Sequence, residues 1–218
     1  MRGLATLLVT LVAAGAPRAA AAQRVSKDGC RVDSSAAWFR AQRAWSDESR
    51  HDWADESFRA ALLRATGGDA PRDALLGFEL ADAPPAGRGD SATVARLRAL
   101  AAQRGAPWPT RSVVGPAGVR AVWLLAARDT ALARTALHRM MEAGPDESPP
   151  AAVAILEDRL RLLAGRKQIY GTQLVRGAGG ALAPAPTEDP AHLDLRREAA
   201  GLAPLAQALC AASSARAR

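Results

Sequence analysis

A stripe of apolar residues near position 155 constrains the fold of this chain more than any other feature. Its members recur at intervals of three, four and three residues: Val153, Leu156, Leu160 and Leu163. This spacing is typical of an α-helix that buries one face against a core. Prolines at positions 149 and 150 and a glycine at position 165 are typical of helix ends. The sequence therefore predicts a packed helix over residues 149–165.

Helical spacing recurs along most of the chain, and glycine or proline separates the helical segments. Both residues favour helix ends, so each break is expected to be a turn or loop. Two prolines and two glycines within residues 82–89 predict a linker. The sequence thus predicts an N-terminal helical region with a linker over residues 23–89, and a main helical domain over residues 90–212. Helices are expected at 33–45, 48–65, 90–104, 116–125, 130–141, 149–165 and 190–200, with a last one from 204.

One segment departs from helical spacing. Residues 169–175 alternate as a strand does, residues 177–180 form a glycine-rich turn, and residues 181–186 can return as a partner strand. Pro184 and Pro186 cannot donate backbone hydrogen bonds, which confines the return strand to an edge. The predicted fold class is therefore mainly α, with one helical domain and one small β-hairpin near residues 168–186.

The first 22 residues have the pattern of a secretory signal peptide. Arg2 supplies a positive start, an apolar stretch follows, and small residues end it at Ala22. The stretch is shorter than the roughly 20 apolar residues that span a bilayer comfortably. We therefore expect cleavage after Ala22 and export to the periplasm or the outside, with no stable membrane span left. An uncleaved anchor is the alternative.

The charge balance is basic but scattered. The chain carries 29 Lys and Arg against 22 Asp and Glu, and loss of Arg2 and Arg18 would lower the formal net charge from +7 to +5. The arginines are scattered among acidic residues, and aromatic residues make up 4% of the chain. Nucleic-acid binding normally needs a concentrated basic patch, so no nucleic-acid partner is expected.

Two cysteines follow the predicted cleavage site, Cys30 and Cys210. Disulfides persist in exported proteins, so one bridge from the mature N-terminus to the last helix is a candidate. The alternative is two unrelated thiols, because the sequence does not give the distance between them.

Three arginines fall on apolar helix faces and mark a candidate polar site. Lone buried charges are very costly, so these arginines need partners unless their stems are buried and their heads stay in water. Acidic residues close by in the sequence, with Tyr, Thr and Gln residues of the predicted hairpin, are the expected partners. The candidate site comprises Asp158, Arg159, Gln168, Tyr170, Thr172, Gln173, Asp189, Asp194, Arg196 and Arg197, with Glu188 as a further acidic neighbour.

Several of these residues also carry a resemblance to a known family. The pieces are Trp108-Pro109, Val114-Gly115, Trp123-Leu124-Leu125, Asp158-Arg159, Gln168-Ile169-Tyr170-Gly171-Thr172-Gln173, Glu188-Asp189, Arg196-Arg197 and Gly201-Leu202. Over about residues 90–209 the chain resembles a family of uncharacterised, often exported bacterial proteins, a domain of unknown function. The resemblance implies a mainly helical domain without an assigned activity. Family members carry Gln-His after the Trp-Leu-Leu helix, whereas Ala127 and Arg128 stand here, so a catalytic histidine at that place would be missing.

The common catalytic motifs do not occur in the sequence. It has no Gly-x-Ser-x-Gly, Walker loop, His-Glu-x-x-His or Cys-x-x-Cys. The pairs His51/Asp55 and His138/Glu142 supply two ligands each, and two ligands do not make a metal site. His192 near Asp189 is a candidate base without a visible nucleophile. No cofactor or metal is therefore expected.

Three functions remain open on this basis. The first is an exported binding module whose hairpin and arginine cluster bind an anionic ligand or an envelope protein. The second is a hydrolytic enzyme that uses carboxylates near Tyr170, since paired carboxylates can do acid–base work when their pKa values differ. The third is a purely structural arginine–carboxylate network.

Overall fold

Helices dominate the computed structural model, which describes residues 36–49, 52–66, 91–103, 105–177 and 179–215. The prediction of a mainly α fold with one β-hairpin is confirmed over these residues. No described helix combines the length and the apolar character that crossing a bilayer would require. The helices are α1 (Ala37–Trp45), α2 (Glu56–Ala65), α4 (Ser91–Ala102), α5 (Arg111–Ala126), α6 (Thr130–Ala143), α7 (Pro150–Leu163), α8 (Leu193–Ala199) and α9 (Leu205–Ala215).

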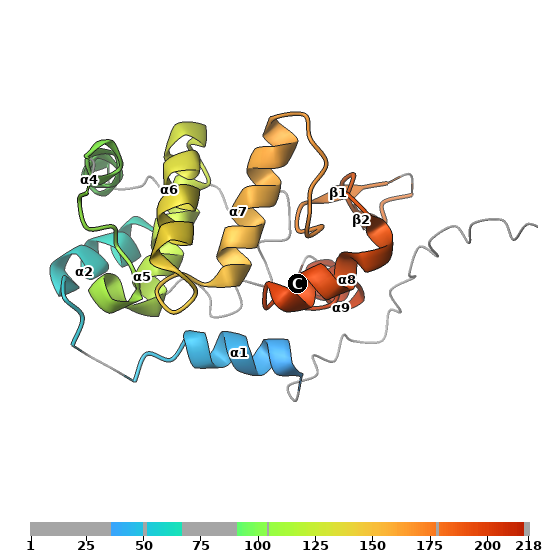
Figure 1. Cartoon of the computed structure of the whole chain (residues 1–218), viewed down its shortest axis with the longest axis horizontal. Coiled ribbons are helices and arrows are strands. Elements are labelled where there is room, and N and C mark those ends of the chain that lie inside the picture. Colours follow the sequence, from blue (N-terminus) through green and yellow to red (C-terminus); the bar gives the residue numbers. More distant parts are fainter. Residues whose placement is uncertain (1–35, 50–51, 67–90, 104, 178, 216–218) are drawn as a thin grey trace, which may run out of the picture.

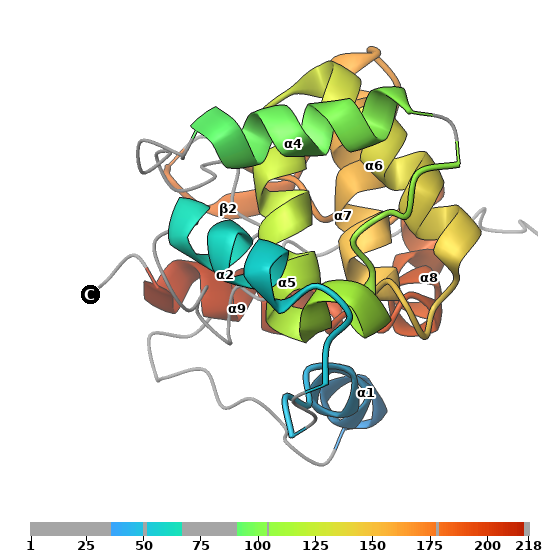
Figure 2. The same ribbon diagram turned by 90° about the vertical axis from the view of Figure 1, so that its left-hand side faces the viewer.

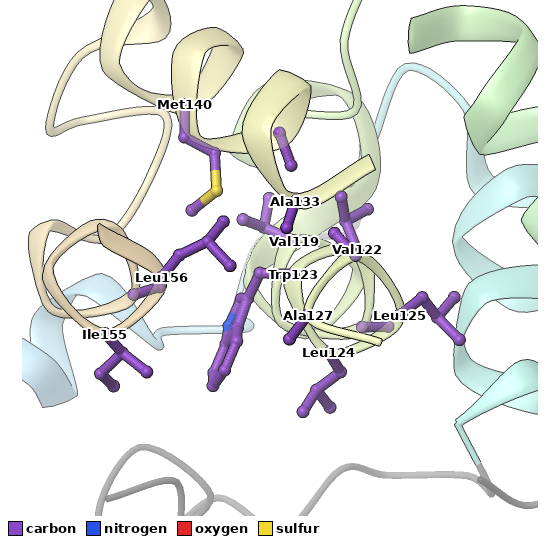
Figure 3. Close-up of a cluster of buried hydrophobic side chains, with 14 of the residues drawn as sticks. Val119, Val122, Trp123, Leu124, Leu125, Ala127, Ala133, Met140, Ile155 and Leu156 are labelled. Carbon is purple, nitrogen blue, oxygen red and sulfur yellow. The ribbon is translucent and has the colours of Figure 1, made fainter. Parts of the chain in front are cut away.

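Helix α5 forms the centre of the core, and its residues 114–126 are all buried. Figure 3 shows Trp123 of α5 beside Leu156 of α7, with Met140 of α6 close by. Phe58 and Leu62 bring α2 into the same apolar cluster. The predicted stripe of α7 therefore packs against this cluster except at its last residue, Leu163, which is 59% exposed.

The central helix bends at Gly115, where φ is +69°. A Cβ atom at this position would lie 2.8 Å from the ring of Trp53, so the close approach requires glycine. Beyond the bend, the backbone N–H of Ala117 donates to the carboxylate of Glu48 at 2.5 Å. Glu48 therefore satisfies a backbone donor in the first turn after Pro116, where the sequence predicted the helix start.

The remaining helices surround this core. α4 packs against α2 and α6, and Figure 2 shows it lying across one end of the bundle. α1 lies along another side, where Gln42 donates to the carbonyl of Gly201 at 2.9 Å and Trp45 donates to the carbonyl of Pro145 at 3.2 Å. Figure 1 shows the hairpin beside α8 and α9, far from α4 along the long axis.

The hairpin is shorter than predicted. β1 (Leu174–Arg176) pairs antiparallel with β2 (Leu182–Pro184), and Leu174 lies opposite Pro184. The prediction of a strand from residue 169 is wrong for residues 169–173, because backbone N–H groups there donate to a carboxylate of α7. The helix predicted from residue 190 begins as a 3₁₀ turn (Pro190–His192) before α8.

Some predictions concern residues that the structure does not describe. These are the signal peptide over residues 1–22, the linker over residues 82–89, the metal-ligand candidate His51 and the disulfide candidate Cys30. The bridge to Cys210 therefore stays a prediction; Cys210 itself is half-buried in α9.

Candidate functional site: a pocket beside a buried polar loop

A buried carboxylate organises residues 168–173, which we call the polar loop. Asp158 lies on α7 and is 0% exposed. One of its oxygens accepts from the backbone N–H of Ile169 at 2.6 Å, and the other accepts from the N–H and the hydroxyl of Thr172 at 3.0 and 2.9 Å. The N–H of Tyr170 lies 3.1 and 3.2 Å from the two oxygens. These donors occupy essentially all the acceptor positions of a carboxylate, so Asp158 holds the loop on α7.

The two glutamines of the polar loop tie it to the hairpin. The side-chain amide of Gln168 donates to the carbonyls of Gln173 at 3.1 Å and Ala185 at 2.7 Å, and its oxygen accepts from the N–H of Gln173 at 3.0 Å. Gln173 in turn donates to the hydroxyl of Thr172 at 3.2 Å. Both glutamines are buried, and their side-chain hydrogen bonds add to backbone bonds with the return segment, such as the one from the N–H of Ala185 to the carbonyl of Gln173 at 2.9 Å.

Arg197 joins the polar loop to the end of α8 and is fully buried. Its Nε donates to the carbonyl of Ala203 at 2.6 Å, and its Nη1 donates to the carbonyl of Tyr170 at 2.9 Å. A guanidinium bridges two segments well because its donors form a rigid, planar fork. The residue therefore holds the loop against the connection between α8 and α9.

Arg196, the residue before it, lies at the surface of the same loop with 25% of its side chain exposed. Its Nε donates to the carbonyl of Ile169 at 2.9 Å, and its Nη2 donates to the carbonyls of Glu188 at 2.6 Å and Asp189 at 2.8 Å. Its Nη1 lies 3.5 Å from a carboxylate oxygen of Asp189. Within the described part of the chain, Nη1 thus has only a long ion-pair contact, while the other two nitrogens make hydrogen bonds.

Two predicted site residues lie apart from this cluster. Arg159 is half-buried on α7 and makes none of the hydrogen bonds or ion pairs of the polar loop described above. Asp194 is exposed and accepts from the backbone N–H of Leu205 at 2.8 Å, where it caps the start of α9. The structure therefore brings together eight of the ten predicted residues, although mainly through backbone groups, where the sequence predicted arginine–carboxylate pairs.

The sequence analysis missed Arg161, which does pair with a carboxylate. Its guanidinium contacts Glu188 and also donates to the carbonyl of Lys167 at 2.7 Å. The available signal was spacing, because Arg161 lies three residues after Asp158 and so on the same side of α7. The ion pair fastens the segment after β2 to α7, and the hydrogen bond to Lys167 fastens the residue before the polar loop.

A pocket with a volume of about 410 Å³ opens beside the polar loop. It lies between the C-terminal end of α6, the start of α7, α8 and the loop, and its surface is mainly apolar. Two side chains of α1 reach this region. They donate to the backbone carbonyls of Pro145, which lines the pocket, and of Gly201, which follows a lining residue in the chain. Sequence analysis did not find the pocket, because most of its residues are typical of a core. Its lining comprises Met140, Met141, Gly144, Pro145, Ser148, Pro150, Val153, Ala154, Tyr170, Arg196, Ala199 and Ala200.

Three titratable groups near the pocket have shifted pKa values. Burial raises the pKa of Tyr170, and the negative charges of Glu157 and Asp158 raise it further. Its hydroxyl therefore stays protonated and neutral around pH 7. Burial likewise raises the pKa of Glu157 above its ordinary value. The hydrogen bond from His192 lowers the pKa of Asp189, which keeps that surface carboxyl ionised.

The described part of the chain offers no group of three or more His, Cys, Asp and Glu residues that could hold a metal ion. His138 pairs with Glu142 at 3.2 Å on the surface of α6. His192 lies 2.8 Å from Asp189, also exposed. The residues that line the pocket include no carboxylate, imidazole or thiol. The pocket can therefore hold a ligand by apolar contact and hydrogen bonds, but its lining supplies no general base.

Comparison with known proteins gives a family. Residues 54–215 match the family described as "Family of unknown function (DUF6624)". The match begins at residue 54, upstream of residue 90, where the resemblance seen in the sequence begins. It includes α2, the polar loop and the whole pocket. No curated protein and no solved structure matches the chain. The chain belongs to this family of unknown function, DUF6624.

Proposed function

We propose that this protein is an exported binding module whose ligand is a small molecule with an apolar body and a negatively charged group. The observation that carries the proposal is the pocket beside Tyr170 and Arg196. Ligand pockets are mostly apolar, have a few polar groups that fix orientation, and measure about 300–1,000 Å³. The volume of this one, about 410 Å³, lies at the small end of that range and favours a small molecule over a protein segment.

The polar groups at the pocket favour an anion. The Tyr170 hydroxyl has no hydrogen-bond partner among the described residues, whose contacts with Tyr170 use its backbone. Among the residues that the structure describes, the Nη1 group of Arg196 has only the 3.5 Å contact with Asp189. Both groups can donate at neutral pH, and a carboxylate accepts from several donors at once. An acidic head group on the ligand would therefore supply a hydrogen-bond acceptor for both side chains.

The hydrolytic alternative has less support. Asp158, its main carboxylate candidate, already accepts hydrogen bonds from three backbone N–H groups and a hydroxyl. A carboxylate in that state has no free lone pair with which to act as a base. Glu157 has a raised pKa but does not line the pocket.

The purely structural alternative accounts for part of the site. It explains the polar loop, where Asp158, Gln168 and Arg197 have partners inside the fold. It does not explain why an apolar pocket opens next to the loop. We therefore assign the structural role to the polar loop and propose the binding role for the pocket.

The test is a titration of the purified protein with octanoate, using calorimetry and thermal melting. Octylamine and octanol have the same apolar chain without the negative charge and serve as ligand controls. A ligand that binds the native state raises the melting temperature, so octanoate should raise it in a concentration-dependent manner and the controls should not. Tyr170→Phe removes only the hydroxyl and should bind octanoate about 5- to 10-fold more weakly, the worth of one hydrogen bond.

Two results would contradict the proposal. Octanoate could fail to bind at millimolar concentration, or Tyr170→Phe could bind it as well as the wild type does. Because the hydroxyl has no partner within the described fold, this variant should melt at the wild-type temperature, which makes a loss of affinity interpretable.

A further inference from the structure

Ser148 is the polar residue of the pocket that neither the sequence analysis nor the proposed function uses. It lies in the loop between α6 and α7, is 1% exposed and forms part of the pocket lining. Its backbone N–H donates to the carbonyl of Gly144 at 2.9 Å. Its hydroxyl, however, is buried and has no hydrogen-bond partner among the described residues. A buried hydroxyl in this state destabilises the fold, because it has lost its contacts with water.

The surroundings of Ser148 contrast with those of the other buried polar side chains at this end of the molecule. The hydroxyl of Thr172 donates to Asp158 at 2.9 Å, and the amide of Gln168 donates to two carbonyls. The fold therefore satisfies these two side chains of the loop and leaves the hydroxyl of Ser148 without a partner among the described residues. An unsatisfied polar group in a ligand pocket is what a site built to hydrogen-bond its ligand has before the ligand enters.

We propose that Ser148 recognises a second, uncharged hydrogen-bonding group on the ligand, so that the ligand class is a small apolar carboxylic acid that also carries a hydroxyl or carbonyl group. This inference rests on the proposed function, which supplies the charged group. Ser148 is almost fully buried, whereas the side chain of Arg196 is 25% exposed. We therefore place the carboxylate at the more exposed Arg196 and the uncharged group at the buried Ser148.

The chemistry of the lining supports this division of roles. Around Ser148 the pocket is formed by apolar residues such as Met140, Pro150 and Ala154. A second charge there would lose its hydration without gaining an opposite charge, whereas a neutral hydroxyl or carbonyl needs only one partner. The methionines, Met140 buried and Met141 60% exposed, adapt readily to apolar chains of different shape.

The experiment compares octanoate with a set of hydroxyoctanoates in which the hydroxyl is moved along the chain. Dissociation constants are measured by calorimetry for the wild type and for Ser148→Ala. At least one hydroxyoctanoate should bind the wild type about tenfold more tightly than octanoate, the effect of one well-placed hydrogen bond that completes a buried group. In Ser148→Ala that preference should vanish, while the affinity for octanoate stays within about twofold.

The melting temperature of the ligand-free protein gives an independent readout. Ser148→Ala removes an unsatisfied hydroxyl and should melt at or above the wild-type temperature. The matched control is Ser57→Ala, since the hydroxyl of Ser57 donates to Asp55 at 2.8 Å outside the pocket. That variant should melt slightly lower than the wild type and keep the preference for the hydroxylated ligand.

The possible results separate the two proposals. If neither octanoate nor any hydroxyoctanoate binds, the proposed function fails and this inference fails with it. If octanoate binds but no hydroxyoctanoate binds more tightly, or the preference survives in Ser148→Ala, only the role of Ser148 is overturned. A lower melting temperature for Ser148→Ala would also overturn that role, because it would mean that the hydroxyl stabilises the fold.

Discussion

The polar loop and the neighbouring pocket differ in whether the fold supplies hydrogen-bond partners for their polar side chains. In the loop, the carboxylate of Asp158 and the amide of Gln168 have hydrogen-bond partners from within the fold. In the pocket, the hydroxyls of Ser148 and Tyr170 lack such partners among the described residues. Polar groups that the fold satisfies stabilise it, whereas polar groups that it leaves open can recognise a ligand. A cluster of polar and charged residues is therefore not in itself evidence of a binding site.

The largest effect should follow from breaking the polar loop at its centre. Asp158→Asn keeps the shape of the side chain but turns an NH₂ group toward backbone N–H donors. Because several buried donors would lose their acceptor, we expect a loss of about 3 kcal/mol in the free energy of unfolding. Urea denaturation measures it, and Asp146→Asn, at an exposed loop position, is the matched control with an expected change within about 0.5 kcal/mol. A loss below about 1 kcal/mol would contradict a structural role for this carboxylate.

A smaller effect should follow from adding one methyl group to the polar loop. Gly171 has a φ of +65°, and a Cβ atom there would lie 3.1 Å from a methyl group of Leu193. Gly171→Ala should lower the free energy of unfolding by about 1–2 kcal/mol, because both the backbone conformation and the packing disfavour a side chain. Gly177→Ala is the control, since its Cβ would lie 3.8 Å from the nearest atom outside its chain neighbours. Equal losses in the two variants would show that the loop tolerates movement.

The smallest effect should have the opposite sign and depend on pH. Burial raises the pKa of Glu157 in the folded protein above its value in the unfolded chain. The folded state then binds the proton more tightly, so the stability contributed by this group is present below its unfolded pKa and is lost as the pH rises through the folded pKa. Glu157→Gln should therefore melt slightly higher than the wild type at pH 7.

The same variant should lose its advantage in acid, where the wild-type carboxyl is itself neutral. Melting curves at pH 4 and pH 7 check this difference, with His138→Gln on the surface of α6 as a comparison. If Glu157→Gln melted lower at pH 7, Glu157 would be a satisfied part of the polar loop, and the boundary between the two regions would have to be moved.

Local pattern was enough to predict most of the helices. The apolar spacing of α7 and the glycine and proline at helix ends are properties of neighbouring residues, and they gave the mainly α fold. The polar loop was predicted as part of a strand because residues 169–175 alternate as a strand does. Their backbone donors are instead taken by Asp158, which lies 11 to 14 residues earlier in the chain. Periodicity within a segment contains no information about such a partner.

Of the candidate site, local pattern predicted the arginines but not the pocket. Arg196 and Arg197 stood out because charges on an apolar helix face must find partners. The pocket did not stand out, because Met140, Val153 and the small residues around them have the same pattern as a packed core. Whether such residues enclose a cavity depends on how three helices meet, which no single segment determines.

The bend of α5 has a consequence for where the physical domain begins. The family match starts at residue 54, but Glu48 satisfies the N–H of Ala117, and the ring of Trp53 covers Gly115. A protein truncated at the start of the family match would keep every matched residue and still lose both contacts with its central helix. The domain boundary given by sequence similarity therefore differs from the one given by contacts with the central helix. Expression of the isolated domain should start upstream of Glu48.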